Sequence, residues 1–350
     1  MDPAGRFSTS YRADTALLRT SPQVVVTIAI VLALVLIAFL GSPRLLSVGT
    51  AITTSAVIAI GLQITTGYAG QVNLGQAAFT GVGAYCTAIL AQRLALPFWL
   101  VIPLSGLAAA AFGWIFGLAA VRIRGFYLAL TTIAAQALFP FLVLNLPSSW
   151  LGSSSGLTLP PATLFAWRLT TERDLYLLTL VVCVIMTAGA FGIVRGHNGR
   201  AFAAVRDDEL AAGMTGLPVA RTKAKAFFVG AFYAGVGGSL IAYQLRLINT
   251  EAFTLYQSIW FIAMIIVGGL GSIVGALVGA VAIRGTQEML SSIGPSLAAQ
   301  LPTLGNSVVF AAMNVFLGGV IIAFLIFEPD GLMRRWNILK EQYRRWPFPR

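Results

Sequence analysis

Charged residues are scarce in this sequence of 350 residues: Asp, Glu, Lys and Arg make up 10% of it, whereas 57% of the residues are hydrophobic. Soluble domains carry about 25% charged residues, so the composition excludes a protein that folds in water. The apolar runs are continuous, while strands of a membrane barrel alternate apolar and polar residues over ~10 positions. The composition therefore predicts an all-α polytopic membrane protein.

Cysteine and histidine are nearly missing. Cys86 and Cys183 each lie within an apolar run and form no C-x-x-C motif, which argues against a disulfide framework or a cysteine metal site. His197 is the only histidine, so a multi-histidine metal site is excluded. We expect neither a metal nor another cofactor.

Acidic residues are missing from the predicted spans, with one exception. Glu288 falls late in an apolar run, and Arg284 lies four residues before it on the same helical face, so the two side chains are expected to pair. Carriers driven by proton or sodium gradients usually depend on carboxylates within the membrane. The shortage of such groups argues against that class.

Lysines are also few. None of Lys223, Lys225 and Lys340 follows a glycine, so the chain has no Walker A loop for ATP. The sequence shows no constellation of residues for hydrolysis or redox chemistry either. We therefore expect no enzymatic activity, and any ATP that drives this protein must be hydrolysed by another chain.

Long apolar runs are what the sequence has instead. A spanning helix needs ~20 mostly apolar residues, which suggests about ten transmembrane helices. The runs cover residues 23–40, 48–66, 76–92, 98–121, 126–146, 175–194, 226–244, 257–270, 272–290 and 304–327. The first run is long and lacks an A-x-A cleavage site, so it is expected to be a retained span.

The positions of Lys and Arg orient these spans. Most of the 23 basic residues fall on the cytoplasmic side if both termini are cytoplasmic. The net charge of +11 then comes from basic residues in the cytoplasmic loops and tails, and it does not indicate nucleic-acid binding. The expected layout is a cytoplasmic tail at 1–22, a transmembrane region at 23–327 and a basic cytoplasmic tail at 328–350. Two longer loops are expected, an outer one at 147–174 and an inner one at 195–225.

The stretch from Thr65 to Tyr85, TTGYAGQVNLGQAAFTGVGAY, mixes glycines with polar side chains between two apolar runs. An unbroken spanning helix needs neither, so we expect a glycine-broken helix near residues 65–76. Broken helices at membrane depth must be satisfied by protein or by a water-filled cavity, and transporters commonly handle substrate there. A cytoplasmic turn between two spans is the alternative, and the residues alone leave both open.

Small residues at four-residue spacing predict two seams where helices pack closely. One seam contains Gly271, Gly275 and Gly279. The other contains Ala226, Gly230, Ala234 and Gly238. Seams of this kind occur in many membrane proteins and indicate packing rather than a particular function.

The inner loop has a helix-forming first half, Ala201–Ala212, that includes several charged residues and is ended by Gly213, Gly216 and Pro218. This pattern predicts a short cytoplasmic helix between two spans. The helix is either a solvated linker or a docking element that fits a groove on a cytoplasmic partner.

Four stretches resemble the permease subunits of branched-chain amino acid ABC importers, the LivM type in particular. They are GLQITTGYAGQVNLGQAAFTGVGAY (61–85), RGFYLALTTIAAQ (124–136), GRAFAAVRDDELAAGMTGLPVARTKAKAF (199–227) and VGGLGSIVGALVGA (267–280). The first and third are specific, whereas the fourth is shared more widely among related permeases.

The resemblance implies a non-enzymatic subunit of the bacterial inner membrane that forms the path for Leu, Ile or Val. The implied partners are a second, LivH-like permease, two cytoplasmic ATPases, an extracytoplasmic binding protein and the surrounding lipid. Related permeases carry urea, amides or other small organic solutes, and these remain the alternative cargo. A gradient-driven carrier is a further alternative that the shortage of buried acids disfavours.

The resemblance also implies roles for individual residues. The polar residues at the helix break are expected to line the translocation path and to hold the charged ends of an amino acid weakly. These residues are Tyr68, Gln71, Asn73 and Gln76. The residues expected to couple the permease to its ATPase are Arg206, Asp207, Glu209, Ala211, Ala212 and Gly216.

Overall fold

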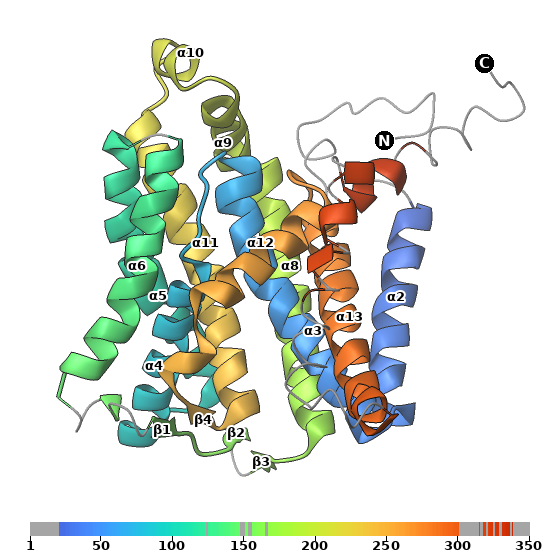
Figure 1. The fold of residues 1–350 in the computed structure, drawn as a ribbon. Coiled ribbons are helices and arrows are strands. Elements are labelled where there is room, and N and C mark those ends of the chain that lie inside the picture. The colour runs from blue at the N-terminus through green and yellow to red at the C-terminus, as the bar shows by residue number, and fades with distance from the viewer. Residues whose placement is uncertain are drawn as a thin grey trace, which may run out of the picture.

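The computed structural model describes residues 21–123, 125–147, 151–152, 156–164 and 167–300, with scattered positions between 315 and 338. Helices dominate this part of the chain, as predicted (Figure 1). They are α2 (Ser21–Leu40), α3 (Pro43–Leu62), η1 (Gln63–Tyr68), α4 (Gln76–Arg93), α5 (Phe98–Arg122), α6 (Phe126–Asn145), α8 (Glu172–Arg195), α9 (His197–Asp207), α10 (Glu209–Met214), α11 (Val219–Leu245), η3 (Thr250–Ala252), α12 (Leu255–Gly268) and α13 (Ile273–Gln300). The expected all-α polytopic class is confirmed.

Seven helices in the described part are long and apolar enough to cross a bilayer. This is fewer than the ten spans expected, although the first nine apolar runs all coincide with helices. Helix α4 falls short because glycine, threonine and glutamine lower its hydropathy, and most of its residues are buried against other helices rather than exposed to lipid. The tenth run, 304–327, and both terminal tails lie largely outside the described residues.

Helix α11 lies at the centre of the bundle and packs against α3, α4 and α5. Glycines let these helices approach closely. A Cβ atom at Gly230 would lie 2.9 Å from the carbonyl oxygen of Gly61 on α3, and one at Gly235 would lie 2.8 Å from that of Ser105 on α5. Because lipid offers helices no hydrophobic drive to associate, such close backbone contact is what holds them together.

The two longer loops lie at opposite ends of the bundle (Figure 1). Helices α9 and α10 project at one end, and four short strands lie at the other. The strands are β1 (Leu157–Thr158), β2 (Ala162–Leu164), β3 (Trp167–Leu169) and β4 (Leu247–Ile248). Strand β1 pairs antiparallel with β4, and β2 pairs antiparallel with β3. The β1–β4 pair ties the 147–174 loop to the chain that leaves α11.

A glycine turn separates α12 from α13. Gly269 and Gly271 have φ angles of 112° and 79°, a region that L side chains rarely adopt. Gly271 therefore belongs to the turn and not to the helical face expected for it. Gly275 does lie on α13 and faces α12, because a Cβ atom there would approach the carbonyl oxygen of Gly268 to 2.8 Å.

The Gly275 contact predicts that Gly275→Ala destabilises the protein by about 1–3 kcal/mol, since the methyl group would meet backbone that cannot move aside cheaply. Gly285→Ala is the matched control, because a Cβ atom at Gly285 on the same helix meets nothing within 4 Å. Thermal unfolding and purified yield in detergent measure the difference. Equal stability of the two variants would show that α12 and α13 do not depend on this contact.

Candidate functional site

The predicted helix break falls between the end of α3 and the start of α4, in the segment from Gln63 to Gln76. Helix α3 continues into the π-helix η1, and the chain from 69 to 75 then runs back along α11 towards α4 (Figure 1). The side-chain Nε2 of Gln76, the first residue of α4, donates to the carbonyl oxygen of Ile58 at 3.1 Å. Because Ile58 lies well inside the span that ends at Tyr68, α4 begins within the bundle rather than at its surface. The predicted glycine-broken helix is confirmed.

Backbone N–H groups at the break donate to side chains. These bonds run from Leu74 N to Thr132 Oγ1 (2.9 Å), from Gly75 N to Asn73 Oδ1 (2.9 Å), from Ala77 N to Ser258 Oγ (2.9 Å) and from Ala78 N to Gln136 Oε1 (2.8 Å). A helix start leaves its first N–H groups without backbone partners, and water is not present at membrane depth to satisfy them. The side chains of α6 and α12 supply the acceptors instead. We call Asn73, Thr132, Gln136 and Ser258 the α4 cap.

The α4 cap also joins three helices to one another. Ser258 Oγ on α12 donates to Gln136 Oε1 on α6 at 3.2 Å. Gln136 Nε2 donates in turn to the carbonyl oxygen of Phe253 at 2.5 Å. Ser258, Gln136 and Thr132 are buried, so loss of one member would strand the bonding groups of the others.

The polar residues expected to line a path are engaged within the protein. Asn73 Nδ2 donates to Gln76 Oε1 at 2.9 Å, and Gln71 Nε2 donates to the carbonyl oxygen of Ala69 at 2.9 Å. Asn73 and Gln76 are 0% exposed. Tyr68 is half-buried and packs against the core. The contacts of these side chains brace the broken helix, and their path-lining role stays a prediction.

Gln63 is a further bracing residue that the sequence analysis did not single out. Its Nε2 donates to the carbonyl oxygens of Gly269 (3.0 Å) and Ser272 (3.1 Å). The π-helix η1 is thereby tied to the turn between α12 and α13. The available signal was a lone glutamine near the end of the apolar run 48–66.

Arg206 on α9 connects the inner loop to the break. Its Nη1 donates to the carbonyl oxygen of Gly67 in η1 at 2.6 Å. The aliphatic part of the same side chain lies beside Gly70, where a Cβ atom would come within 2.9 Å of Arg206 Cγ. Its Nη1 also lies 3.1 Å from the Cβ position of Gly271. One side chain therefore contacts both the broken helix and the α12–α13 turn.

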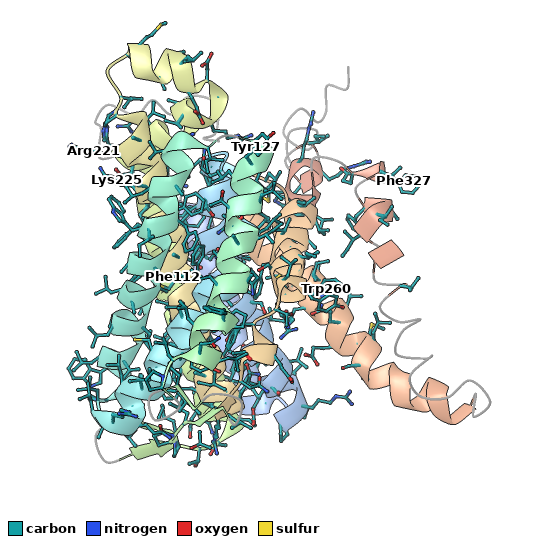
Figure 2. The ribbon with its side chains drawn as sticks, turned by 60° about the vertical axis from the view of Figure 1, so that its left-hand side comes forward. Phe112, Tyr127, Arg221, Lys225, Trp260 and Phe327 are labelled. Carbon is teal, nitrogen blue, oxygen red and sulfur yellow. The ribbon has the colours of Figure 1, made fainter. Side chains whose placement is uncertain are left out.

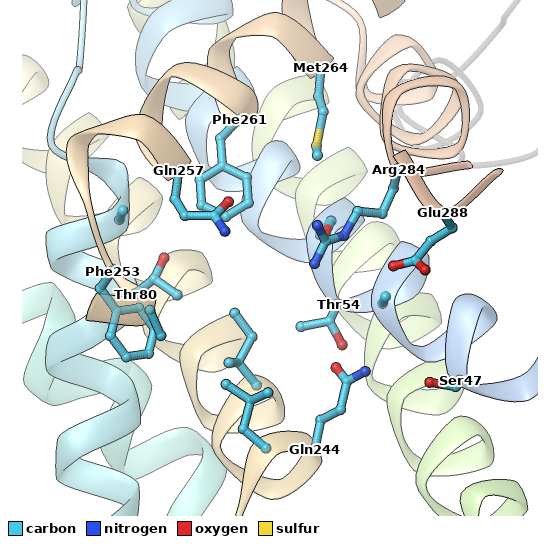
Figure 3. Close-up of a pocket in the computed structure, with 16 residues that line it drawn as sticks. Ser47, Thr54, Thr80, Gln244, Phe253, Gln257, Phe261, Met264, Arg284 and Glu288 are labelled. Carbon is cyan, nitrogen blue, oxygen red and sulfur yellow. The ribbon is translucent and has the colours of Figure 1, made fainter. Parts of the chain in front are cut away.

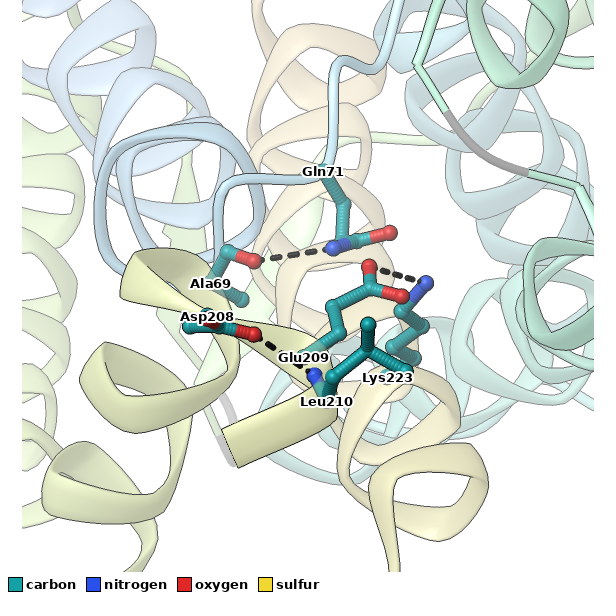
Figure 4. A network of polar contacts seen from close by, with 6 residues as sticks. All are labelled: Ala69, Gln71, Asp208, Glu209, Leu210 and Lys223. Carbon is teal, nitrogen blue, oxygen red and sulfur yellow. Dashed lines mark hydrogen bonds and ion pairs between the residues drawn. The ribbon is translucent and has the colours of Figure 1, made fainter. Parts of the chain in front are cut away.

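Helix α10 is held by a cap and by an ion pair with a buried lysine (Figure 4). Asp208 Oδ1 accepts from the backbone N–H groups of Leu210 (2.8 Å) and Ala211 (3.1 Å). Glu209 Oε1 pairs with Lys223 Nζ on α11, and the lysine side chain is only 1% exposed. In Figure 4 the Gln71 side chain extends towards this pair.

The residues expected to couple to an ATPase divide into two groups. Ala212 is buried and Glu209 is turned towards Lys223. The exposed group consists of Arg206, Asp207, Ala211 and Gly216. The largest exposed side chains on α10 are apolar ones that the sequence analysis did not select. Leu210 is 65% exposed and Met214 is 88% exposed.

A cavity of about 220 Å³ lies between α3, α4, α12, α13 and the end of α11 (Figure 3). Arg284 and Glu288 line it from α13, and Thr54 and Thr80 line it from α3 and α4. The contact ion pair of Arg284 with Glu288 expected from their spacing is not formed, because Arg284 Nη1 donates to Gln287 Oε1 at 3.0 Å instead, although the Glu288 charge still acts on Arg284. None of Tyr68, Gln71, Asn73 and Gln76 lines this cavity.

The α4 cap generates a stability prediction. Ser258→Ala removes the acceptor of the Ala77 N–H group, and an unsatisfied buried donor costs about 1–3 kcal/mol. We expect a lower unfolding temperature in detergent and faster amide hydrogen exchange at the start of α4. Thr131→Ala is the control, since its hydroxyl donates only to the carbonyl oxygen of Tyr127 on an exposed face of α6. Unchanged exchange at Ala77 in Ser258→Ala would contradict the prediction.

Comparison with known proteins gives a consistent result. The family model for the branched-chain amino acid transport system permease component matches residues 44–325. No solved structure gives a significant match.

Several curated proteins are similar to most of the chain. The LivM permease protein of the high-affinity branched-chain amino acid transport system of Escherichia coli K12 is 28% identical, over 84% of this chain and 71% of its own length. The corresponding LivM protein of Salmonella typhimurium is 29% identical, over 79% of this chain and 67% of its own length. The LivH permease protein of Salmonella typhimurium is 27% identical, over 82% of this chain and 94% of its own length. The chain therefore belongs to the family of branched-chain amino acid transport system permease components.

Proposed function

We propose that this chain is the LivM-type permease subunit of an ABC importer that moves amino acids with branched apolar side chains across the bacterial cytoplasmic membrane. The family supports the transport role, and one geometric observation supports the way in which it is driven. That observation is the bond from Arg206 on the projecting loop to the Gly67 carbonyl oxygen at the helix break. An ATPase subunit that moves this loop would therefore move the broken helix directly.

The proposed complex contains a second permease, two ATPases and an extracytoplasmic binding protein. Relatives of this chain include both LivM and LivH permease proteins of one kind of transport system, which supports pairing with a different permease chain. The end that carries α9 and α10 is assigned to the cytoplasm. Arg221 and Lys225 are exposed at that same end (Figure 2), in keeping with the cytoplasmic excess of basic residues in membrane proteins.

The ATPase is proposed to bind the exposed face of α10. Leu210 and Met214 present large apolar side chains to solvent at the end of a loop that projects from the bundle. An apolar helix face of this kind fits a hydrophobic groove on a partner. Asp207, Ala211 and Gly216 would lie at the edges of that contact, while Glu209 and Ala212 would hold α10 in place from behind.

Coupling requires contacts that differ between the two states of the machine, because a ligand shifts an equilibrium only through such a difference. We assign the transmitting contacts to Arg206. Movement of α9 would displace the Arg206 guanidinium from the Gly67 carbonyl oxygen and from the turn at Gly271. The break and the α12–α13 turn would then respond together.

Transport in proteoliposomes tests this function. With its partner subunits and binding protein, the wild-type chain is expected to take up L-leucine when ATP is enclosed, and uncouplers should have no effect. A gradient-driven carrier would show the reverse dependence. Competition by urea or amides that exceeds competition by leucine and valine would assign a different cargo.

The docking surface is tested by Met214→Asp. A carboxylate at this position would have to be desolvated in an apolar groove, so we expect the ATPase to be lost during purification and ATP-driven uptake to fall about tenfold or more. Met214→Leu keeps an apolar surface and is the matched control, for which full association is expected. Normal ATPase recovery with Met214→Asp would remove α10 from the interface.

The Glu209–Lys223 pair yields a separate prediction. Breaking a buried ion pair costs about 3–5 kcal/mol because a charge is stranded, and Glu209→Lys places two cations together. We expect faster hydrogen exchange in α10 of the permease without ATPase, and a loss of ATPase stimulation by the loaded binding protein. The double variant Glu209→Lys with Lys223→Glu should restore slow exchange. If Glu209→Lys alone exchanges like the wild type, the pair does not hold α10.

A further inference from the structure

Arg284 and Glu288 place two opposite charges within a membrane span. Both lie in the segment Ile273–Ser292 of α13, about one helical turn apart, and both line the cavity. Charged side chains at membrane depth are costly and usually mark a pathway or a binding site for a substrate or ion. The Glu288 charge acts on Arg284, but no ion pair at contact distance joins the two side chains in the described part of the chain, so mutual neutralisation does not fully account for them.

Each of the two charges has bonding capacity left over. A guanidinium group carries five N–H donors, and Arg284 uses Nη1 on Gln287 Oε1 while its buried Nε has no protein partner. The Glu288 carboxylate has a long contact of 3.5 Å with the Ser291 hydroxyl. In Figure 3 the guanidinium extends from α13 towards Thr54, and the Glu288 carboxylate points into the cavity on the same side as Arg284.

The rest of the cavity wall is mixed. Thr54 Oγ1 is buried and has no hydrogen-bond partner, and Gln257 adds a further polar group to the lining. Phe253, Phe261 and Met264 form apolar parts of the lining. The volume of about 220 Å³ is below the roughly 300–1,000 Å³ that drug-sized ligands occupy, so the cavity suits a smaller solute.

The start of α4 is not available to bind a negative charge here. Helix N-termini commonly hold anionic groups, and broken helices in transporters do so with substrate carboxylates. In this chain the N–H groups of Ala77 and Ala78 already donate to Ser258 and Gln136. Arg284 is therefore the cationic donor that the cavity lining offers to an anion.

We propose that the cavity binds an α-amino acid with an apolar side chain. Arg284 binds the carboxylate of the solute through charge-assisted hydrogen bonds, and Glu288 binds its ammonium group. The surfaces of Phe253, Phe261 and Met264 contact the apolar side chain. The assignment rests on the proposed import function and adds to it a substrate-recognition site within the permease itself.

The cavity lies where a solute coming from the binding-protein side would enter. Ser47 near the start of α3 and Leu245 at the end of α11 line it, and both belong to the end of the bundle opposite α9 and α10 (Figure 1). Ala77 and Thr80 line it as well, so the cavity reaches the first turns of α4. A solute bound there would rest against the helix start that the α4 cap holds in place.

Equilibrium binding of radiolabelled L-leucine to the purified permease complex, without the binding protein, tests the proposal. Arg284→Gln and Glu288→Gln are each expected to weaken binding roughly tenfold to a hundredfold, because one charged end of the solute loses its partner. Arg284→Lys should retain part of the affinity. The control Thr286→Ala, whose hydroxyl donates only to the Ala282 carbonyl oxygen and which does not line the cavity, should bind like the wild type.

Competing solutes report the recognition of each end separately. Leucinamide lacks the carboxylate and 4-methylpentanoate lacks the ammonium group, so both should compete poorly with leucine on the wild type. Arg284→Gln should no longer distinguish leucine from leucinamide. A variant that only lost stability would keep this discrimination in the fraction that remains folded.

A second variant covers the case in which the charge substitutions fail to assemble. Thr54→Cys, in a background where Cys86 and Cys183 are replaced by serine, should react with a thiol reagent and be protected by L-leucine. Unprotected labelling, or wild-type leucine binding by Arg284→Gln and Glu288→Gln, overturns the site. Absence of leucine uptake by the wild-type complex would instead refute the proposed import function.

Discussion

The start of α4 inside the bundle is the constraint on which the rest of this structure depends. Backbone N–H groups cannot remain unpaired at membrane depth, and a helix that begins there needs acceptors that its own backbone cannot supply. Ser258 and Gln136 supply them from α12 and α6. The need of the α4 backbone for acceptors therefore helps to position α4, α6 and α12 relative to one another. Side-chain packing alone would not set this arrangement.

The same constraint determines where the cavity is. Because α4 starts at the level of Ile58 and not at the membrane surface, the space in front of its first turns is left to side chains of α3, α12 and α13. Arg284 and Glu288 reach into that space from α13 (Figure 3). A continuous α3–α4 hairpin would fill the bundle more evenly and would offer no such opening beside a fixed helix start.

Much of the fold could be predicted from the sequence, because a helix that crosses a lipid bilayer must be mostly apolar and can be recognised by its hydropathy. The break near 65–76 was also predictable, since glycine and amide side chains do not occur together in an ordinary span. The partners of those amides were not. Asn73 and Gln76 look equally suited to a substrate or to each other, and only the three-dimensional contacts show that they bond to each other. Likewise, the four-residue spacing of Arg284 and Glu288 permits an ion pair without requiring one.

The inner loop illustrates the same limit and leads to a mechanistic consequence. Sequence reasoning selected its charges for contact with a partner, yet Glu209 is bound to Lys223, and Arg206, although exposed, is bound to Gly67. Their charges hold α9 and α10 against the break, which leaves the apolar Leu210 and Met214 outside. If the ATPase moves this loop as proposed, the ion pair and hydrogen bonds at its base would make it move together with the helices that it contacts. A force applied at the tip of α10 would therefore reach Gly67 and Gly271 through the Arg206 side chain. In the proposed orientation these two residues lie on the cytoplasmic side of the α4 cap, whereas the cavity lies on the opposite side of the α4 cap.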